Sequence, residues 1–319
     1  MAGGQERILR RRIRSVEATK KITRAMELIA ASQMVRAQSR IAGSKPYLEG
    51  IESLLVDIVA DGSAPERLVG VPESPENIAV VMIVSDRGLC GGYNAFVLRA
   101  AERLMRTGEH AGRNYRAVGV GKKALGYFRF RGRGLEAHFP MGDRPTYEDA
   151  RRIAHTVVPP FMRGELDLVQ LVSTRFISAG NQVVETRQLL PVKPPEAAQS
   201  TEPEDRKRTT TIGPGEGYFE YEPEPDELLG LLVPRYAEAA LYGALLEASA
   251  SEHVARQRAM SAATDNADDL ITTLRRVMNR ARQDSITTEI MEIVGGAEAL
   301  RQGTDHEPSY EAQVKETVA

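Results

Sequence analysis

The sequence has a single cysteine, Cys90, and no tryptophan. One cysteine excludes an internal disulfide and a multi-cysteine zinc site, and it is typical of a reducing compartment. The five histidines are scattered without the spacing of metal ligands, which disfavours a metal enzyme. The longest clean apolar run, 78–84, has seven residues, whereas a membrane-spanning helix needs about 20. We therefore expect no disulfide scaffold, no metal site and no membrane span.

Net charge is also small, but the charges are unevenly distributed. The 42 basic and 44 acidic residues give a formal charge of −2, yet segment 7–45 contains eleven basic residues against only Glu17 and Glu27. Such a segment could bind nucleic acid phosphates, but neither a recognition fold nor interleaved aromatic residues accompany it. Contact with acidic protein surfaces is the favoured interpretation. The first twenty residues lack the apolar stretch of a secretory signal, which predicts a cytosolic location or a cytosolic face.

The basic segment has the periodicity of a helix with a narrow apolar stripe, which predicts a coiled-coil partner. The stripe is formed by Leu9, Ile13, Val16, Ile22, Met26, Ile29, Ala30, Met34, Ala37 and Ile41. The spacing between Val16 and Ile22 breaks a strict heptad. We expect Ser44, Lys45 and Pro46 to interrupt the helix, which then resumes to residue 60.

The other end of the chain predicts a second long helix, over 229–301. Its apolar positions are Leu270, Leu274, Val277, Ala281, Ile286, Ile290 and Ile293. About 60 residues of helix reach roughly 90 Å, which no compact domain of this size needs. Two such helices, one at each end of the chain, predict a long antiparallel two-helix coiled coil.

The middle of the chain predicts a Rossmann-like α/β domain inserted between these helices, over 76–194. Strands are expected at 77–84, 115–120, 135–139, 167–176 and 182–190, and helices at 95–105, from Lys122, and at 147–162 with a break at Pro159-Pro160. Alternation of strand and helix predicts a mainly parallel sheet covered on both faces, and the last two strands are expected to form a hairpin. The fold class is therefore α/β.

The segment 195–228 differs in composition from its surroundings. It has ten acidic residues against three basic ones and five prolines, which predicts an exposed acidic connector. A flexible tail is expected at 302–319.

Two glycine-rich loops are candidate sites. Residues 119–124 fit the loose dinucleotide pattern G-x-G-x-x-A after a strand, but no acidic residue follows at the right distance, so a tight strand-to-helix turn is favoured. Residues 85–94 place Ser85, Asp86 and Cys90 after a strand, but no histidine lies nearby to activate a nucleophile. We therefore expect no catalytic residue and no bound cofactor.

Five motifs occur in order over about 5–300: RRRIRSVEATKKITRAMELIAAS (10–32), IVSDRGLCGGYN (83–94), FEYEPEPDELL (219–229), ASEHVARQRAMSAATDNADDLI (250–271) and RARQDSITTEIMEIVGGAEAL (280–300). Together they resemble the gamma subunits of F-type ATP synthases. The resemblance implies a central rotor shaft that couples rotation of the c-ring to conformational change in the catalytic beta subunits. It implies as partners the hexamer of alpha and beta subunits, the epsilon subunit and the c-ring, at the cytoplasmic face of a bacterial membrane. The shaft itself is expected to be non-catalytic.

The resemblance also implies contact residues. The implied rotor–stator contacts are Met26, Cys90, Arg282, Gln283, Thr287 and Glu289, and the implied c-ring contacts are Phe219, Tyr221 and Glu222. Met26 has an alternative interpretation as seam packing, and the polar residues beside Ile286, Ile290 and Ile293 have one as part of a solvated face. The chain departs from the family pattern at Ala18, Gln33, Met278 and Asp284. Two other functions remain open: a dinucleotide-binding enzyme with helical arms, and a coiled-coil scaffold for nucleic acid.

Overall fold

The computed structural model describes residues 2–60, 67–70, 72–192 and 225–304. Phe219, Tyr221 and Glu222, most of the acidic connector and the end of the chain from residue 305 lie outside the described residues. The chain divides into two compact units, one formed by Met1–Arg24 with Ser261–Ala319 and the other by Ala25–Met260. The unit boundaries fall inside the two long helices, whereas the sequence placed its boundaries at helix ends.

The two long helices are present as expected. Helix α1 covers Ala2–Ala60 and helix α7 covers Pro225–Thr304. The expected interruption at Pro46 is wrong, because α1 continues through it. Pro46 cannot donate a hydrogen bond to Ala42, but both residues are exposed, so water can reach the free carbonyl group. Within the described residues, no helix has an apolar stretch long enough to cross a membrane.

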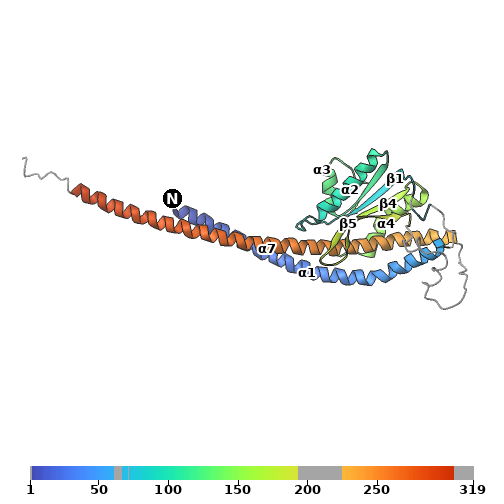
Figure 1. Cartoon of the computed structure of the whole chain (residues 1–319), viewed down its shortest axis with the longest axis horizontal. Helices are drawn as coiled ribbons and strands as arrows, with labels where there is room; N and C mark the ends of the chain where they lie inside the picture. Colours follow the sequence, from blue (N-terminus) through green and yellow to red (C-terminus); the bar gives the residue numbers. More distant parts are fainter. Residues whose placement is uncertain (1, 61–66, 71, 193–224, 305–319) are drawn as a thin grey trace, which may run out of the picture. The chain divides into compact units, whose positions relative to one another are not determined.

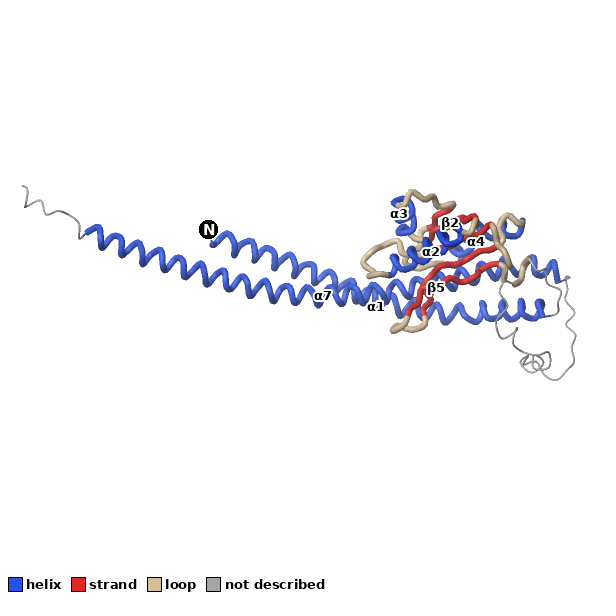
Figure 2. The backbone as a smooth tube through the Cα atoms, turned by 45° about the horizontal axis from the view of Figure 1, so that its top comes forward, coloured by secondary structure: helices blue, strands red, loops and turns tan. Residues whose placement is uncertain are grey.

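The unit 25–260 contains a five-stranded sheet (Figures 1 and 2). Its strands are β1 (Asn77–Ile83), β2 (Asn114–Val120), β3 (Ala137–Phe139), β4 (Leu168–Phe176) and β5 (Gln182–Leu190). Their order is β3-β2-β1-β4-β5. The first four strands pair in parallel, and β5 pairs antiparallel with β4. The predicted parallel sheet and terminal hairpin are confirmed.

Both faces of this sheet are covered, because residues of β1 alternate between two apolar cores. On one face, α2 (Tyr93–His110) and α3 (Lys122–Phe130) pack over Val80 and Met82. On the other face, α4 (Tyr147–Arg163) packs over Val81, together with residues 51–58 of α1 and 229–248 of α7. Figure 1 shows α2 and α3 on one side of the sheet and α4 on the other.

The expected helix break at Pro159-Pro160 is also wrong. Helix α4 runs through both prolines to Arg163, after a capping box at Thr146 and Asp149. Proline has a helical φ but removes a hydrogen bond, so a helix continues past it only when other contacts offset the cost. Here Val158 and Phe161, on either side of the prolines, are buried in the sheet core.

The other unit is an antiparallel helix pair whose core contains Ile13, Ile271 and Leu274. Leu9, Val16 and Met278 pack against this core. The predicted contribution of Leu9, Ile13 and Val16 is therefore confirmed. The predicted contribution of Leu274 is also confirmed. Leu270 and Val277 are substantially exposed, and the next residues along α7, Ile271 and Met278, take their places in the core.

The sequence had suggested that the heptad on α1 breaks after Val16, but in the structure the heptad continues. Its seam continues through Lys20, Thr23 and Glu27, which are all buried or half-buried, while Ile22 and Ile29 are exposed. The Thr23 hydroxyl makes a buried 2.8 Å hydrogen bond with the Thr264 hydroxyl. Lys20 forms an ion pair with Asp268. Polar residues therefore occupy seam positions where the periodicity analysis required apolar ones.

Candidate functional site

The loop that carries Cys90 connects β1 to α2 and is tied together by polar side chains. The Asn94 amide donates to Cys90 Sγ at 3.2 Å, and its Oδ1 accepts from the Ser85 backbone at 2.9 Å. The Cys90 side chain is buried, with 1% of its surface exposed, and burial raises the pKa of its thiol. Leu89 has a positive φ of 62° and is 63% exposed. The exposed surface of this loop therefore includes Leu89 but not the thiol.

Asp86 joins this loop to two others. Its carboxylate accepts hydrogen bonds from the backbone N–H groups of Lys122, Met141 and Gly142, at 2.8, 3.3 and 3.0 Å. Burial alone would raise the pKa of Asp86, but these three donors lower it below its ordinary value. The carboxylate occupies the N-terminus of α3, where a nucleotide phosphate would bind in a dinucleotide fold.

Gly121, the N-cap residue of α3, supports the same conclusion. Its φ is +96°, and a Cβ atom there would lie 2.1 Å from the Val84 carbonyl oxygen. The glycine is required by backbone geometry, without reference to any ligand. The structure therefore favours the tight-turn interpretation of 119–124.

Helix α7 contacts the Cys90 loop through a buried ion pair. Arg256 and Glu252 lie 2.5 Å apart with 11% and 8% of their side chains exposed, and Arg256 also donates to the Gly88 carbonyl at 3.4 Å. The Tyr93 hydroxyl donates to the Ala248 carbonyl at 3.1 Å. The loop is thus held at two points along α7.

His253 is buried beside this pair. Burial, followed by the positive charge of Arg256, lowers its pKa to about 4, while Asp143 acts in the opposite direction. Its Nε2 atom has no hydrogen-bond partner among the described residues. The imidazole is therefore neutral at neutral pH.

The candidate residues on α7 form a separate group in the unit with residues 1–24. Arg282 and Glu289 are seven residues apart, so they share a helix face with Ile286. Gln283 and Thr287 are four apart, and the Thr287 hydroxyl donates to the Gln283 carbonyl at 3.0 Å. From residue 286 to residue 301 every residue is exposed. This end of α7 presents an uncovered stripe of apolar side chains with polar groups beside it.

Met26 and Cys90, the remaining described candidates, lie in the unit 25–260 on different elements. Met26 is half-buried on α1, next to the seam positions Thr23 and Glu27. The structure thus brings together the four α7 residues, but it does not gather all the candidates into one site.

Sequence reasoning considered Asp86 only as part of a nucleophile site and missed its role as an acceptor of backbone N–H groups. It also missed the Glu252–Arg256 pair and the Thr23–Thr264 pair. Asp86 had a recognisable signal, because a carboxylate just after a parallel strand can reach neighbouring helix N-termini. The two pairs had none, since their partners are identified only by how the helices pack.

Comparison with known proteins gives the same family that the sequence motifs resemble. The family model described as ATP synthase matches residues 5–300. The ATP synthase gamma chain of Frankia casuarinae is 44% identical over 306 residues, covering 94% of this chain and 99% of the relative. That of Mycolicibacterium vanbaalenii is 43% identical over 309 residues, covering 92% and 97%. The chain belongs to the ATP synthase gamma family.

Solved structures of gamma-family assemblies agree with the fold. A central stalk and c-ring structure of the Tetrahymena thermophila mitochondrial ATP synthase contains a chain that matches with a TM-score of 0.58 and 26% identity, covering 76% of this chain and 99% of that one. A chain of the Euglena gracilis mitochondrial ATP synthase matches with a TM-score of 0.64 and 17% identity, covering 97% and 98%. The second likeness concerns the fold alone.

Proposed function

We propose that the chain is the central-stalk rotor subunit of a proton-translocating F-type ATP synthase. In this role it couples rotation of the c-ring to conformational change in the catalytic beta subunits. The observation that carries the proposal, together with family membership, is the end of α7, where apolar and polar side chains from residue 286 to residue 301 are all exposed in the part of the chain that the structure describes. An exposed stripe of this kind is expected to be covered by another protein.

The partners in this proposal are the hexamer of alpha and beta subunits, the epsilon subunit and the c-ring. Rotation would act as a population shift, because each angle of the shaft offers different contacts to a given beta subunit and so changes its nucleotide affinity. The chain itself is non-catalytic, and its place is the cytoplasmic face of a bacterial membrane. The bacterial relatives support this location.

Four α7 residues are the proposed rotor–stator contacts at the exposed end: Arg282, Gln283, Thr287 and Glu289. Met26 and the Cys90 loop are proposed to contact the beta subunits lower on the shaft, the loop through Leu89 because the thiol is buried. Phe219, Tyr221 and Glu222 remain the proposed c-ring contacts.

Replacing Arg282 and Gln283 together by alanine tests this assignment in the assembled complex. Both side chains are exposed, so the helix content of the chain should stay the same, while steady-state ATP turnover should fall because contacts to the stator are lost. The matched control is Arg276→Ala with Asn279→Ala, which removes exposed polar groups from the same helix nearer its paired region. Unchanged turnover in an intact complex containing the Arg282→Ala, Gln283→Ala pair would contradict the assignment.

Copurification tests the function as a whole. The chain should be recovered in a stoichiometric complex with ATP-hydrolysing subunits at native mass. Recovery of the chain alone, or bound to nucleic acid in a salt-dependent manner, would refute the rotor proposal.

A further inference from the structure

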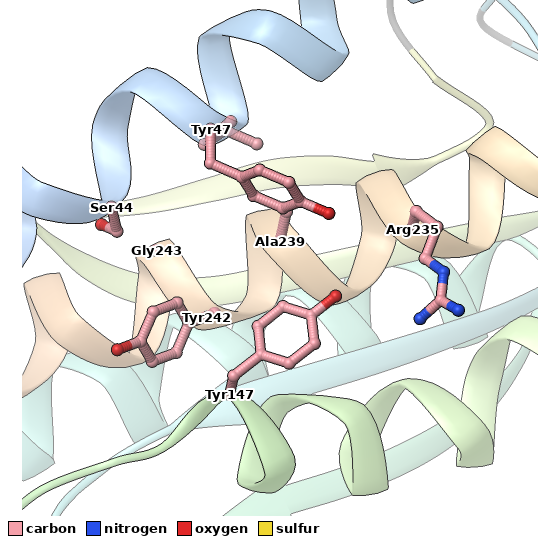
Figure 3. Close-up of a pocket in the computed structure, with 8 residues that line it drawn as sticks. Ser44, Tyr47, Tyr147, Arg235, Ala239, Tyr242 and Gly243 are labelled. Carbon is pink, nitrogen blue, oxygen red and sulfur yellow. The ribbon is translucent and has the colours of Figure 1, made fainter.

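A pocket of about 450 Å³ lies in the unit 25–260, away from every residue assigned above (Figure 3). Three elements line it. Helix α1 contributes Ser44, Tyr47 and Leu48, helix α4 contributes Tyr147, and helix α7 contributes Arg235, Ala239, Tyr242 and Gly243. The volume and the mixture of aromatic walls with a few polar groups are typical of small-molecule sites.

Small residues open this space. Gly243 has no side chain, and a Cβ atom there would meet only Leu48 Cδ2, at 3.7 Å. Ala239, one turn earlier on α7, leaves room beneath the Tyr47 ring in Figure 3. Any longer side chain at these two positions would point into the space that the tyrosines surround.

The pocket has a polar end. Figure 3 shows the hydroxyl groups of Tyr47 and Tyr147 directed toward the side where Arg235 lies. Glu238, with 7% of its surface exposed, accepts from the Tyr147 hydroxyl at 2.7 Å and from Arg235 at 3.1 Å. Burial and the bond to Glu238 raise the pKa of Tyr147 to about 12, so its hydroxyl remains a donor at neutral pH.

Donors exceed acceptors at this end. The bonds from Tyr147 and Arg235 both end on the same oxygen of Glu238, Oε2. Arg235 has five N–H groups and directs one of them to Glu238. Tyr47 lines the pocket and is 56% exposed, so its hydroxyl is open to solvent or to a ligand. A ligand that satisfied this end would have to bring acceptor atoms, and a guanidinium group favours a planar anion.

The rest of the lining is mainly aromatic. The rings of Tyr147 and Tyr242 meet edge to face, with centroids 5.8 Å apart and an angle of 75°. Together with Leu48 and Ala239 they form walls suited to a flat ring.

We propose that this pocket binds a planar aromatic anion, of the arene carboxylate class, with its acid group on Arg235 and Tyr47 and its ring against Tyr147 and Tyr242. Binding at this site is independent of the rotor role, because none of its residues belongs to the proposed contacts with other subunits. The ligand would connect α1, α4 and α7 and hold the three helices together.

Isothermal calorimetry on the full chain, with 2-naphthoate as the probe, tests the proposal. One equivalent should bind to the wild type. Arg235→Gln should weaken binding at least about tenfold, since it removes a charge-assisted hydrogen bond, and Gly243→Leu should abolish binding by filling the pocket. Arg276→Gln, which removes an exposed arginine elsewhere on α7, is the matched control and should bind like the wild type.

Far-ultraviolet circular dichroism of each variant shows whether it is folded. If Gly243→Leu is unfolded, Tyr47→Leu is measured in its place. Absence of binding to the wild type would overturn the proposal. So would equal affinity in Arg235→Gln and the wild type, which would place the probe elsewhere. Tighter binding of 2-naphthylmethylammonium than of 2-naphthoate would also overturn it, because the site would then be an aromatic cage for cations.

Discussion

The polar residues buried between α7 and the α/β domain hold the Cys90 loop in place, and their contribution depends on each charge having its partner. A buried ion pair contributes little net stability compared with apolar residues of the same size, but a single unpaired buried charge is strongly destabilising. Glu252 and Arg256 form such a pair. The exposed pair of Glu17 and Arg275, with 39% and 60% of their side chains exposed, provides a comparison within the same protein.

We expect Arg256→Met to lower the free energy of unfolding by about 3–5 kcal/mol, because Glu252 is then left buried without a counter-charge. Adding Glu252→Leu should restore most of this loss. Urea unfolding measures both variants. Arg275→Gln, the control, should cost less than about 1 kcal/mol. If Arg256→Met cost no more than the control, the pair would not be buried in solution.

His253 predicts a pH dependence. Its pKa is about 4 in the fold and about 6.5 in the unfolded chain, so the unfolded chain binds more protons between these values. The contribution of His253 to stability is therefore complete above about pH 6.5 and is lost as the pH falls toward 4. Arg256 and Arg40 oppose the imidazolium charge, whereas Asp143 favours it.

The measurement compares unfolding free energies at pH 7 and pH 5 for the wild type and His253→Leu. The wild type should lose about 2 kcal/mol more than the variant on acidification. Burial raises the pKa of Glu247 and Glu252, which increases the stability of the fold as the pH falls. This effect is present in both proteins, so the difference between them cancels it. Equal losses in both proteins would show that His253 titrates normally.

At the scale of elements, periodicity and turn residues predicted every strand of the sheet and both long helices to within a few residues. The continuous apolar run 78–84 and the hairpin residues 178–181 carry strong local signals. The seam of the coiled coil was predicted less well, because Lys20, Thr23 and Glu27 occupy heptad positions that the partner helix makes tolerable. Candidate contacts such as Arg282 came from resemblance alone, since an exposed polar residue looks the same whether or not a partner covers it.

The prolines inside helices were predicted wrongly for a related reason. Helix propensity predicts that proline ends a helix. On either side of Pro46, however, packing along a whole face of α1 keeps the helix continuous. Ala37 and Ile51, before and after it, are both buried. Tertiary contacts therefore override the local preference.

Replacing Pro46 by alanine should stabilise the protein by about 1–2 kcal/mol. The helical hydrogen bond that alanine adds stabilises the fold, and this gain exceeds the cost of the greater conformational entropy of the unfolded chain. Thermal unfolding measures the change. Pro145→Ala, in the loop before α4, is the control and should be neutral or destabilising. A lower unfolding temperature for Pro46→Ala would mean that α1 depends on the proline for its path.

At the scale of the whole molecule, segments of both long helices share a core with the sheet. One of the two sheet cores includes Leu55 of α1 and Leu245 of α7. The α/β domain therefore lacks part of its own core when both long helices are removed, whereas the unit 25–260 keeps all of it.

A fragment covering residues 25–260 should consequently fold cooperatively, while a fragment covering 67–192 should not. Far-ultraviolet circular dichroism with thermal unfolding distinguishes the two outcomes. A sharp transition in the shorter fragment would show that the long helices are dispensable for the sheet.

Two contacts between α1 and α7 join residues that are very far apart along the chain: Thr23 and Thr264, which are buried, are separated by 241 positions, and Glu17 and Arg275, which are exposed, by 258. At ribosomal rates of about 5–20 residues per second, the first helix emerges roughly 12–50 s before its partner. During that time its seam and its many arginines are uncovered. The leading helix of a newly made chain therefore lacks its own partner helix until synthesis is nearly complete.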